Sequence, residues 1–282
     1  TSLHVFIEKP LCTTIDDCLK VIEWSKNRSG LVWMGLEYRY MPPVAELISI
    51  VHSGGVGQVQ QVSIREHREP FYPKVGNWNR FTSKTGGTLV EKCCHYFNLM
   101  DHIAKERPTR VFASGGQRVN FLDESYEGVK ADMLDSAYVI LEYPSGKRAM
   151  LDLCMFAENT VDKEHISVTG SEGKVESFLP SLEVRHGKRS AVGNFKQWSH
   201  DASKPKVESR KVWDESIKYN GFHYGASYLE HLKFFNAIKG GKGPDVSLED
   251  GLRSVASGLA AQLSIAQGRP VLMSEVLPAG WN

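Results

Sequence analysis

The first forty residues contain a strand, a helix and a second strand, and this order allows few folds. Residues 5–7 form a short apolar run, and Thr14 can cap a helix that extends to about Asn27. Residues 31–35 form a second apolar run with the composition of a buried strand. Two strands joined by one helix are parallel neighbours, because the helix returns the chain to the edge where the first strand began. We therefore expect the chain to begin with the end of a doubly wound, parallel sheet.

The hydrophobic period changes to two from Gln58 onward. Val62 and Ile64 alternate with polar residues, as in a strand with one buried face. The same alternation, or enrichment in β-branched residues, predicts strands at 111–113, 137–143, 149–155, 165–169 and 174–178. Turn residues at 144–147 and 171–173 are typical of hairpins between neighbouring strands. The middle of the chain is therefore predicted to form an open, mainly antiparallel sheet.

In sequence order, helices are predicted before, between and after these strands. Their expected ranges are 42–51, 88–104 with Thr88 as its cap, about 224–239, and 247–268, which opens with a capping box of Ser247 and Asp250. A polar stretch from about 187 to 209 is predicted to be a loop. The fold class is thus α/β with α+β character: residues 1–38 end one domain, and residues 39–282 form a second domain of sheet and flanking helices.

Charge and cysteine content narrow the class of protein. The 34 Lys and Arg residues nearly balance the 33 Asp and Glu residues, and a formal charge of +1 does not suit a nucleic-acid binder. Five cysteines, of which Cys93 and Cys94 are adjacent, do not form a disulfide framework and favour a reducing compartment, so we expect a cytoplasmic protein. No apolar stretch reaches the length of a membrane span, so no membrane partner is expected.

The segment from Gly86 to His95 carries the densest chemical signal. Four polar residues share one face of the predicted helix: Glu91, His95, Asn98 and His102. A carboxylate four residues before a histidine can orient the imidazole and raise its basicity, as a general acid/base pair requires. A solvated polar stripe explains the same spacing. Lys9, directly after the first strand, lies where open α/β sheets bind ligands, and Pro10 can hold a fixed, even cis, turn there.

Four motifs in order resemble the Gfo/Idh/MocA oxidoreductase family. They are Glu8-Lys9-Pro10 after a strand, the segment 34–42 (MGLEYRYMP), Gly86-Gly87 with Glu91 and His95, and the closing segments 244–251 (PDVSLEDG) and 268–271 (GRPV). The resemblance spans nearly the whole chain. It implies a Rossmann domain, of which residues 1–38 would be the end, followed by a substrate and oligomerisation domain at 39–282. It also implies hydride transfer between NAD or NADP and a secondary alcohol of a sugar or cyclic polyol such as inositol, by a homo-oligomer, dimer or tetramer.

The resemblance assigns roles to individual residues. Lys9 matches the lysine between nicotinamide and substrate, with Glu8 and Pro10 beside the cofactor, and His95 matches the general base. Glu91 occupies the place usually held by the aspartate that partners this histidine. Asn98 stands where another acidic residue is frequent, and we assign it to the substrate site.

The predicted site contains four further residues and no metal. Arg39 follows the second strand and can meet cofactor or substrate, although a structural ion pair is an open alternative. His223 and Tyr224 can bind sugar hydroxyls, and Trp78 can stack on a sugar, unless these side chains serve packing alone. Cys93, Cys94 and His95 lack zinc spacing, so no metal site is predicted.

A glycine-rich cofactor loop is missing from the sequence. The nearest string, at 55–60, lacks a third glycine and leads into a strand, so it is interpreted as a turn. We therefore expect the chain to be a fragment of a longer dehydrogenase, without a complete cofactor site. Two alternatives stay open: an NAD-dependent glycosidase of the same fold, and a non-catalytic fragment that binds a ligand or oligomerises.

Overall fold

The predicted β-α-β unit is present at the start of the chain. In the computed structural model, which describes residues 2–189 and 207–281, β1 (Val5–Glu8) pairs in parallel with β2 (Val32–Gly35), and α1 (Ile15–Lys26) connects them. The Oγ1 atom of Thr14 accepts a hydrogen bond from the backbone N–H of Asp17 at 3.2 Å, so the predicted helix cap is confirmed. Lys9 therefore follows the carboxyl end of a parallel strand, as expected from the sequence.

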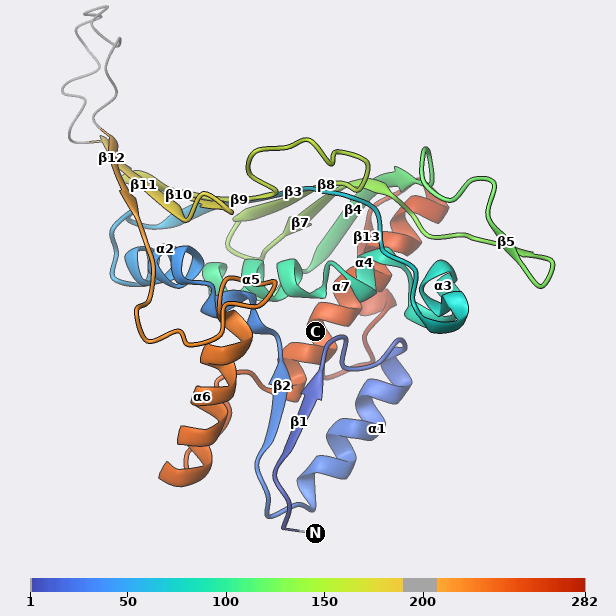
Figure 1. Ribbon diagram of the computed structural model, residues 1–282, viewed down its shortest axis with the longest axis horizontal. Helices are drawn as coiled ribbons and strands as arrows, with labels where there is room; N and C mark the ends of the chain where they lie inside the picture. Colours follow the sequence, from blue (N-terminus) through green and yellow to red (C-terminus); the bar gives the residue numbers. More distant parts are fainter. Residues whose placement is uncertain (1, 190–206, 282) are drawn as a thin grey trace, which may run out of the picture.

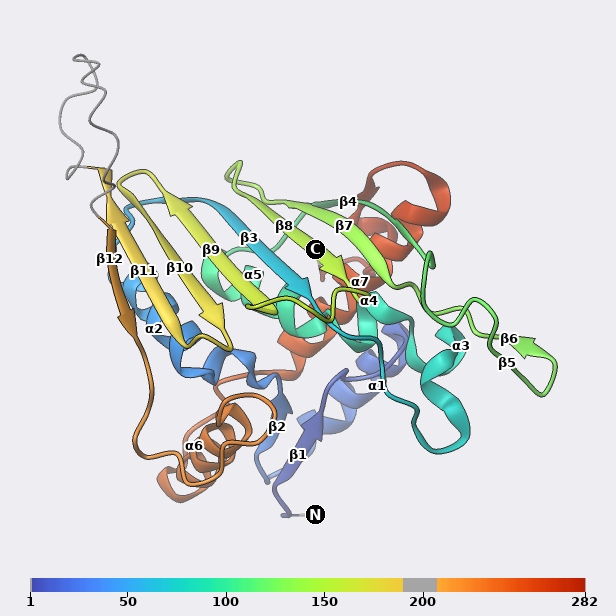
Figure 2. The ribbon, with the colours of Figure 1, turned by 45° about the horizontal axis from the view of Figure 1, so that its top comes forward.

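Nine strands form one large sheet, which Figure 2 shows face-on. Their order is β12 (Val207–Lys211), β11 (Glu183–Lys188), β10 (Gly173–Leu179), β9 (Glu164–Gly170), β3 (Val59–His67), β8 (Arg148–Cys154), β7 (Ser136–Glu142), β4 (Arg110–Gly116) and β13 (Val271–Leu272). Among the described strand pairs of this sheet, only β3 and β8 are parallel. The open, mainly antiparallel sheet and the mixed α/β class are thus confirmed.

Two strands border the stretch that was predicted to be a loop. β11 and β12 pair with each other in antiparallel register, and residues 190–206 of that stretch lie outside the described residues. Every residue of β12 is exposed, so this edge strand has no buried face and no hydrophobic alternation. A pattern based on burial could not have found it.

Helices cover one face of the large sheet, and no helix of the described residues lies on the other, which we call the bare face. Figure 1 shows α2 (Pro42–His52), α5 (Cys94–Ala104) and α7 (Leu248–Gln267) beneath the sheet, and α6 (Ala226–Gly240) beside β2. The remaining short elements are η1 (Glu37–Tyr40), η2 (Val75–Arg80), α3 (Thr82–Thr85), β5 (Ser125–Tyr126), β6 (Val129–Lys130) and η4 (Met273–Glu275). Within residues 2–189 and 207–281, no helix has the length and apolarity that crossing a membrane requires.

The helix predicted at 88–104 is interrupted. It consists of α4 (Thr88–Glu91) and α5, and Lys92 and Cys93 lie between them, where the N–H of Cys93 bonds the carbonyl of Thr88 five residues back. The cap is Gly87, not Thr88, whose hydroxyl instead donates to the carbonyl of Leu134 at 2.5 Å. Gly87 has φ 87°, and a Cβ there would lie 1.8 Å from Gln262 Oε1, so glycine is required.

Candidate functional site

One cavity of about 470 Å³ brings Lys9, His95 and His223 together. It opens beside the end of β1, and its walls also come from η1, from β3 and β9 of the large sheet, and from the junction of α4 and α5. Residues that are 214 positions apart in sequence, Lys9 and His223, thus share one site. Ligands of open α/β sheets bind at the carboxyl ends of strands, which is where this cavity lies.

Lys9 is held in the cavity by Glu91. Its Nζ donates to the backbone carbonyl of Glu91 at 2.7 Å and approaches Glu91 Oε1 at 3.3 Å. The Lys9–Pro10 peptide is cis, as the sequence allowed. The Glu91 carboxylate therefore pairs with Lys9, and the hydrogen bond that we expected between Glu91 and His95 is not formed. The break after α4 accounts for this, because the regular i, i+4 geometry does not continue across Lys92 and Cys93.

His95 is oriented by an aromatic ring. Its side chain is 3% exposed, and its Nδ1 atom has no hydrogen-bond partner among the described residues. The ring of Tyr38 lies parallel to the imidazole, with 3.9 Å between centroids and 4° between planes. Burial lowers the pKa of His95 well below its usual value, and the nearby charges of Lys9 and Lys92 lower it further. A neutral imidazole in this position can accept a proton at pH 7.

A buried group of charged residues forms the base of the cavity. Lys92 Nζ lies 2.9 Å from Glu66 Oε1 and donates to the hydroxyl of Tyr38 at 2.5 Å. Glu66 faces Glu164 across the β3–β9 pair, and burial, together with the charge of Glu66, raises the pKa of Glu164 to about 7. Sequence reasoning missed these residues. The sequence offered no signal for Lys92, because its partners Glu66 and Tyr38 lie on other elements.

His223 and Tyr224 line the cavity, and their role in substrate binding stays a prediction. His223 Nδ1 lies 2.5 Å from Glu37 Oε1, and its Nε2 lies 3.5 Å from the hydroxyl of Tyr38. Of the two histidines in the described part of the cavity wall, His223 pairs with a carboxylate and His95 does not. The oriented carboxylate–histidine pair expected at Glu91 and His95 is therefore found at Glu37 and His223.

Several predicted site residues do not reach the cavity. Arg39 is buried and donates to Asn98 Oδ1 at 2.7 Å and to the carbonyl of Asp245 at 3.1 Å, so Arg39 and Asn98 bind each other. Glu8 is exposed to solvent, and Trp78 in η2 is 39% exposed. Neither of them lines the cavity, and Pro10 does not line it either. The helical spacing predicted that Asn98 would share the site with His95. Asn98 instead contacts the buried Arg39.

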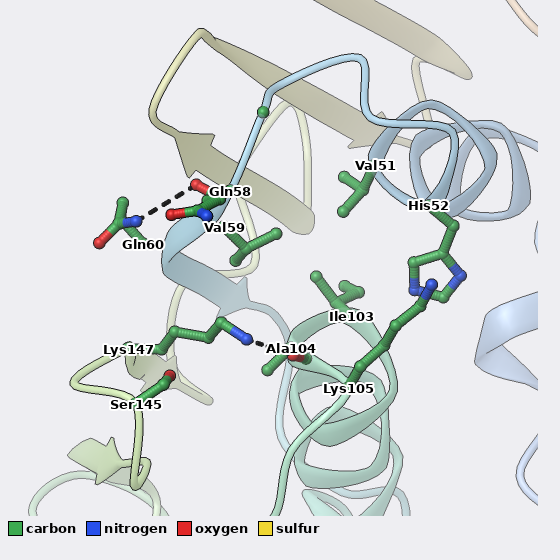
Figure 3. A pocket seen from close by; sticks show the side chains of 11 residues that line it. Val51, His52, Gln58, Val59, Gln60, Ile103, Ala104, Lys105, Ser145 and Lys147 are labelled. Atoms are coloured by element: carbon green, nitrogen blue, oxygen red, sulfur yellow. Dashed lines mark hydrogen bonds between the residues drawn. The ribbon is translucent and has the colours of Figure 1, made fainter.

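A second cavity, of about 420 Å³, lies at the other end of α5 (Figure 3). Its cationic side chains include Lys105 and Lys147, but Lys147 donates to the carbonyl of Ala104 at 2.9 Å and pairs with Glu106 at 2.6 Å. None of the predicted site residues lines it. The cavity that contains Lys9 is therefore the candidate active site.

The described residues offer a cavity at the end of a parallel strand but no glycine-rich turn of the kind that binds a pyrophosphate. Lys9 and His95 share a cavity at the end of a parallel strand, where a reactive ring and an alcohol could meet. The glycines at 54–57 form a turn between α2 and β3, as interpreted from the sequence. Within residues 2–189 and 207–281, no G-x-G-x-x-G turn leads from a strand into a helix, so these residues provide no pyrophosphate cradle of that type.

Comparison with known families gives a match over most of the chain. The Gfo/Idh/MocA family model described as "Oxidoreductase family, C-terminal alpha/beta domain" matches residues 48–273. Among curated relatives, the myo-inositol 2-dehydrogenase of Thermotoga maritima is 29% identical over 278 residues. That alignment covers 97% of this chain and 74% of the relative.

Solved structures show the same architecture. A probable dehydrogenase from Thermotoga maritima superimposes with a TM-score of 0.70 at 26% identity, over 97% of this chain and 74% of that one. A levoglucosan dehydrogenase in complex with NADH and L-sorbose gives a TM-score of 0.77 at 16% identity, over 96% and 73% of the two chains. At 16% identity, the similarity to the levoglucosan dehydrogenase concerns the fold alone.

Proposed function

The chain belongs to the Gfo/Idh/MocA family of oxidoreductases, and we propose that it oxidises a secondary alcohol of a sugar or cyclic polyol with NAD or NADP. The observation that carries this proposal is the convergence of Lys9 and neutral His95 in one cavity at the end of β1. A proton acceptor and a cationic donor are the two groups that alcohol oxidation requires of a protein. The name of the Thermotoga maritima relative favours an inositol-like substrate.

In this proposal, Lys9 and His95 both contact the reacting carbinol. The Lys9 ammonium donates to the substrate oxygen and stabilises the negative charge that develops there. His95 accepts the hydroxyl proton, while the hydride on the same carbon leaves for the nicotinamide, which supplies the oxidant when bound. Glu91 keeps Lys9 in position through the two contacts at 2.7 and 3.3 Å.

A substrate screen of the full-length protein tests this function. We expect NAD or NADP to be reduced in the presence of myo-inositol or another cyclic polyol, as measured by absorbance at 340 nm. The same assay with aryl glycosides distinguishes the alternative, since a glycosidase releases the aglycone without accumulating reduced cofactor. Release from glycosides with no polyol oxidation would contradict the proposed reaction.

The bare face of the sheet supports self-association. Phe112, Ile140 and Met150 lie in one row across β4, β7 and β8 and are each about 40% exposed. We propose that a second copy covers this face, because an open sheet face with apolar residues is stabilised by burial. Light scattering is expected to give a dimer or tetramer mass and a smaller mass for Ile140→Lys. Leu3→Lys, in the exposed segment before β1, serves as the control, and an unchanged mass for Ile140→Lys would contradict the interface.

A further inference from the structure

The proton that His95 accepts is poorly stabilised on its imidazole. His95 is 3% exposed, and its imidazole lies near the charges of Lys9 and Lys92. These surroundings disfavour an imidazolium, so the accepted proton must be passed on before the next turnover. A second acceptor is required, with access both to the cavity and to solvent.

His223 meets both requirements. It lines the same cavity, its side chain is 33% exposed, and the centroids of the His223 and His95 rings are 6.4 Å apart. Glu37 Oε1 lies 2.5 Å from His223 Nδ1, which places the proton of the neutral ring on Nδ1 and leaves Nε2 as the acceptor. The same partnership stabilises the imidazolium after Nε2 is protonated. Ser227 donates to Glu37 as well, which fixes the carboxylate.

Tyr38 lies between the two histidines and limits the route. Its ring is stacked on His95, and its hydroxyl accepts from Lys92 and lies 3.5 Å from His223 Nε2. A face-to-face stack offers no hydrogen bond between the rings, so one water or one substrate hydroxyl must bridge the imidazoles.

We propose that His223, held by Glu37, receives the substrate proton from His95 and delivers it to solvent. The inference rests on the proposed function and adds a residue to it. The O–H bond of the alcohol breaks, and its proton passes to His95, then through the bridging hydroxyl to His223 Nε2, and then to water. The carbon–hydrogen electron pair leaves as hydride to NAD(P)⁺, and the substrate becomes the carbonyl compound. His223 returns to its neutral form, so the cycle balances.

Groups from several elements face His223. Glu37 and Tyr38 face it from η1, His95 from α5, and Glu164 from β9. Glu37 is the one in direct ionic contact, and it fixes the proton of the neutral ring on Nδ1. In Glu37→Gln the amide can present either an oxygen or an N–H to Nδ1, so we expect the single tautomer of His223 to become a mixture. The ¹⁵N chemical shifts of His223 in the cofactor-free protein measure the tautomer directly.

Chemical rescue distinguishes proton transfer from a structural role. In weak buffer, His223→Ala is expected to lower kcat for polyol oxidation about tenfold or more, with KM changed less than about twofold. Added imidazole should restore most of kcat, because a small base can occupy the vacated place. His165→Ala is the matched control, since His165 also pairs with a glutamate, Glu176 at 3.1 Å, but alternates with the buried Glu164 and Ile166 along β9 and so lies on the opposite sheet face. It should behave like wild type.

The outcomes separate this inference from the proposed function. If the wild type oxidises the polyol and His223→Ala does so at the same rate, the relay alone is overturned. The relay alone is also overturned if His223→Ala is slower and added imidazole does not restore its kcat. A His223 ring that keeps the same single tautomer in Glu37→Gln would overturn the role of Glu37. Absence of polyol oxidation by the wild type would overturn the proposed function and the relay with it.

Discussion

Replacing Lys9 with methionine is expected to lower kcat/KM for polyol oxidation by about a hundredfold or more. Methionine preserves the length of the side chain but removes the ammonium that approaches Glu91 and, in the proposed reaction, the substrate oxygen. The loss should fall mainly on kcat, because the charge on that oxygen develops in the transition state. Steady-state kinetics of the full-length protein measure the change.

Two variants control for indirect effects of the Lys9 substitution. Lys20→Met removes an exposed lysine of α1 that pairs with Asp17, and it should leave kcat/KM unchanged. Glu91→Gln keeps an oxygen within reach of Lys9 but removes the charge, and we expect a smaller loss than for Lys9→Met. A Lys9→Met protein that folds as wild type and keeps more than about a tenth of its kcat/KM would remove Lys9 from the mechanism.

Features set by neighbouring residues were predictable from the sequence. The β-α-β unit, the cap at Thr14 and the alternating strands follow from local patterns of apolar and capping residues, and each is present in the structure. The position of Lys9 at the end of β1 follows from the same patterns. For His223 the sequence left two readings open, sugar binding and packing at a helix start, and neighbouring residues could not decide between them.

Features set by contacts between distant segments were not predictable. Regular helical geometry assigned Glu91 to His95, but the interruption at Lys92 and Cys93 leaves Glu91 paired with Lys9. The partner of His223 is Glu37, which is 186 positions away in sequence and is brought to it by η1. Lys92 was overlooked because its partners lie on β3 and η1, and no spacing along the helix reveals them.

The buried pair of Lys92 and Glu66 gives the largest expected effect on stability. Lys92 is 5% exposed and Glu66 is 1% exposed, so a substitution of one partner leaves the other charge in a poorly solvated place. Breaking such a pair costs about 3 to 5 kcal/mol of unfolding free energy. We expect Lys92→Met to show a loss near the lower end of that range, because Arg68 NH1 remains 3.6 Å from Glu66 Oε1. Urea denaturation measures this loss as a lower midpoint, and the m-value should stay unchanged.

The double variant shows whether the cost comes from an uncompensated charge. Glu66→Gln combined with Lys92→Met removes both charges, so it should be more stable than Lys92→Met alone, and the two effects should couple by about 1 kcal/mol or more. Lys163→Met breaks the more exposed pair with Glu69 and should cost less than about 1 kcal/mol. Additive losses in the double variant would instead mean that packing around Tyr38, not charge pairing, accounts for the effect. In that case Lys92→Met would disturb Tyr38, which Lys92 contacts and which stacks on His95, and polyol oxidation would fall together with stability.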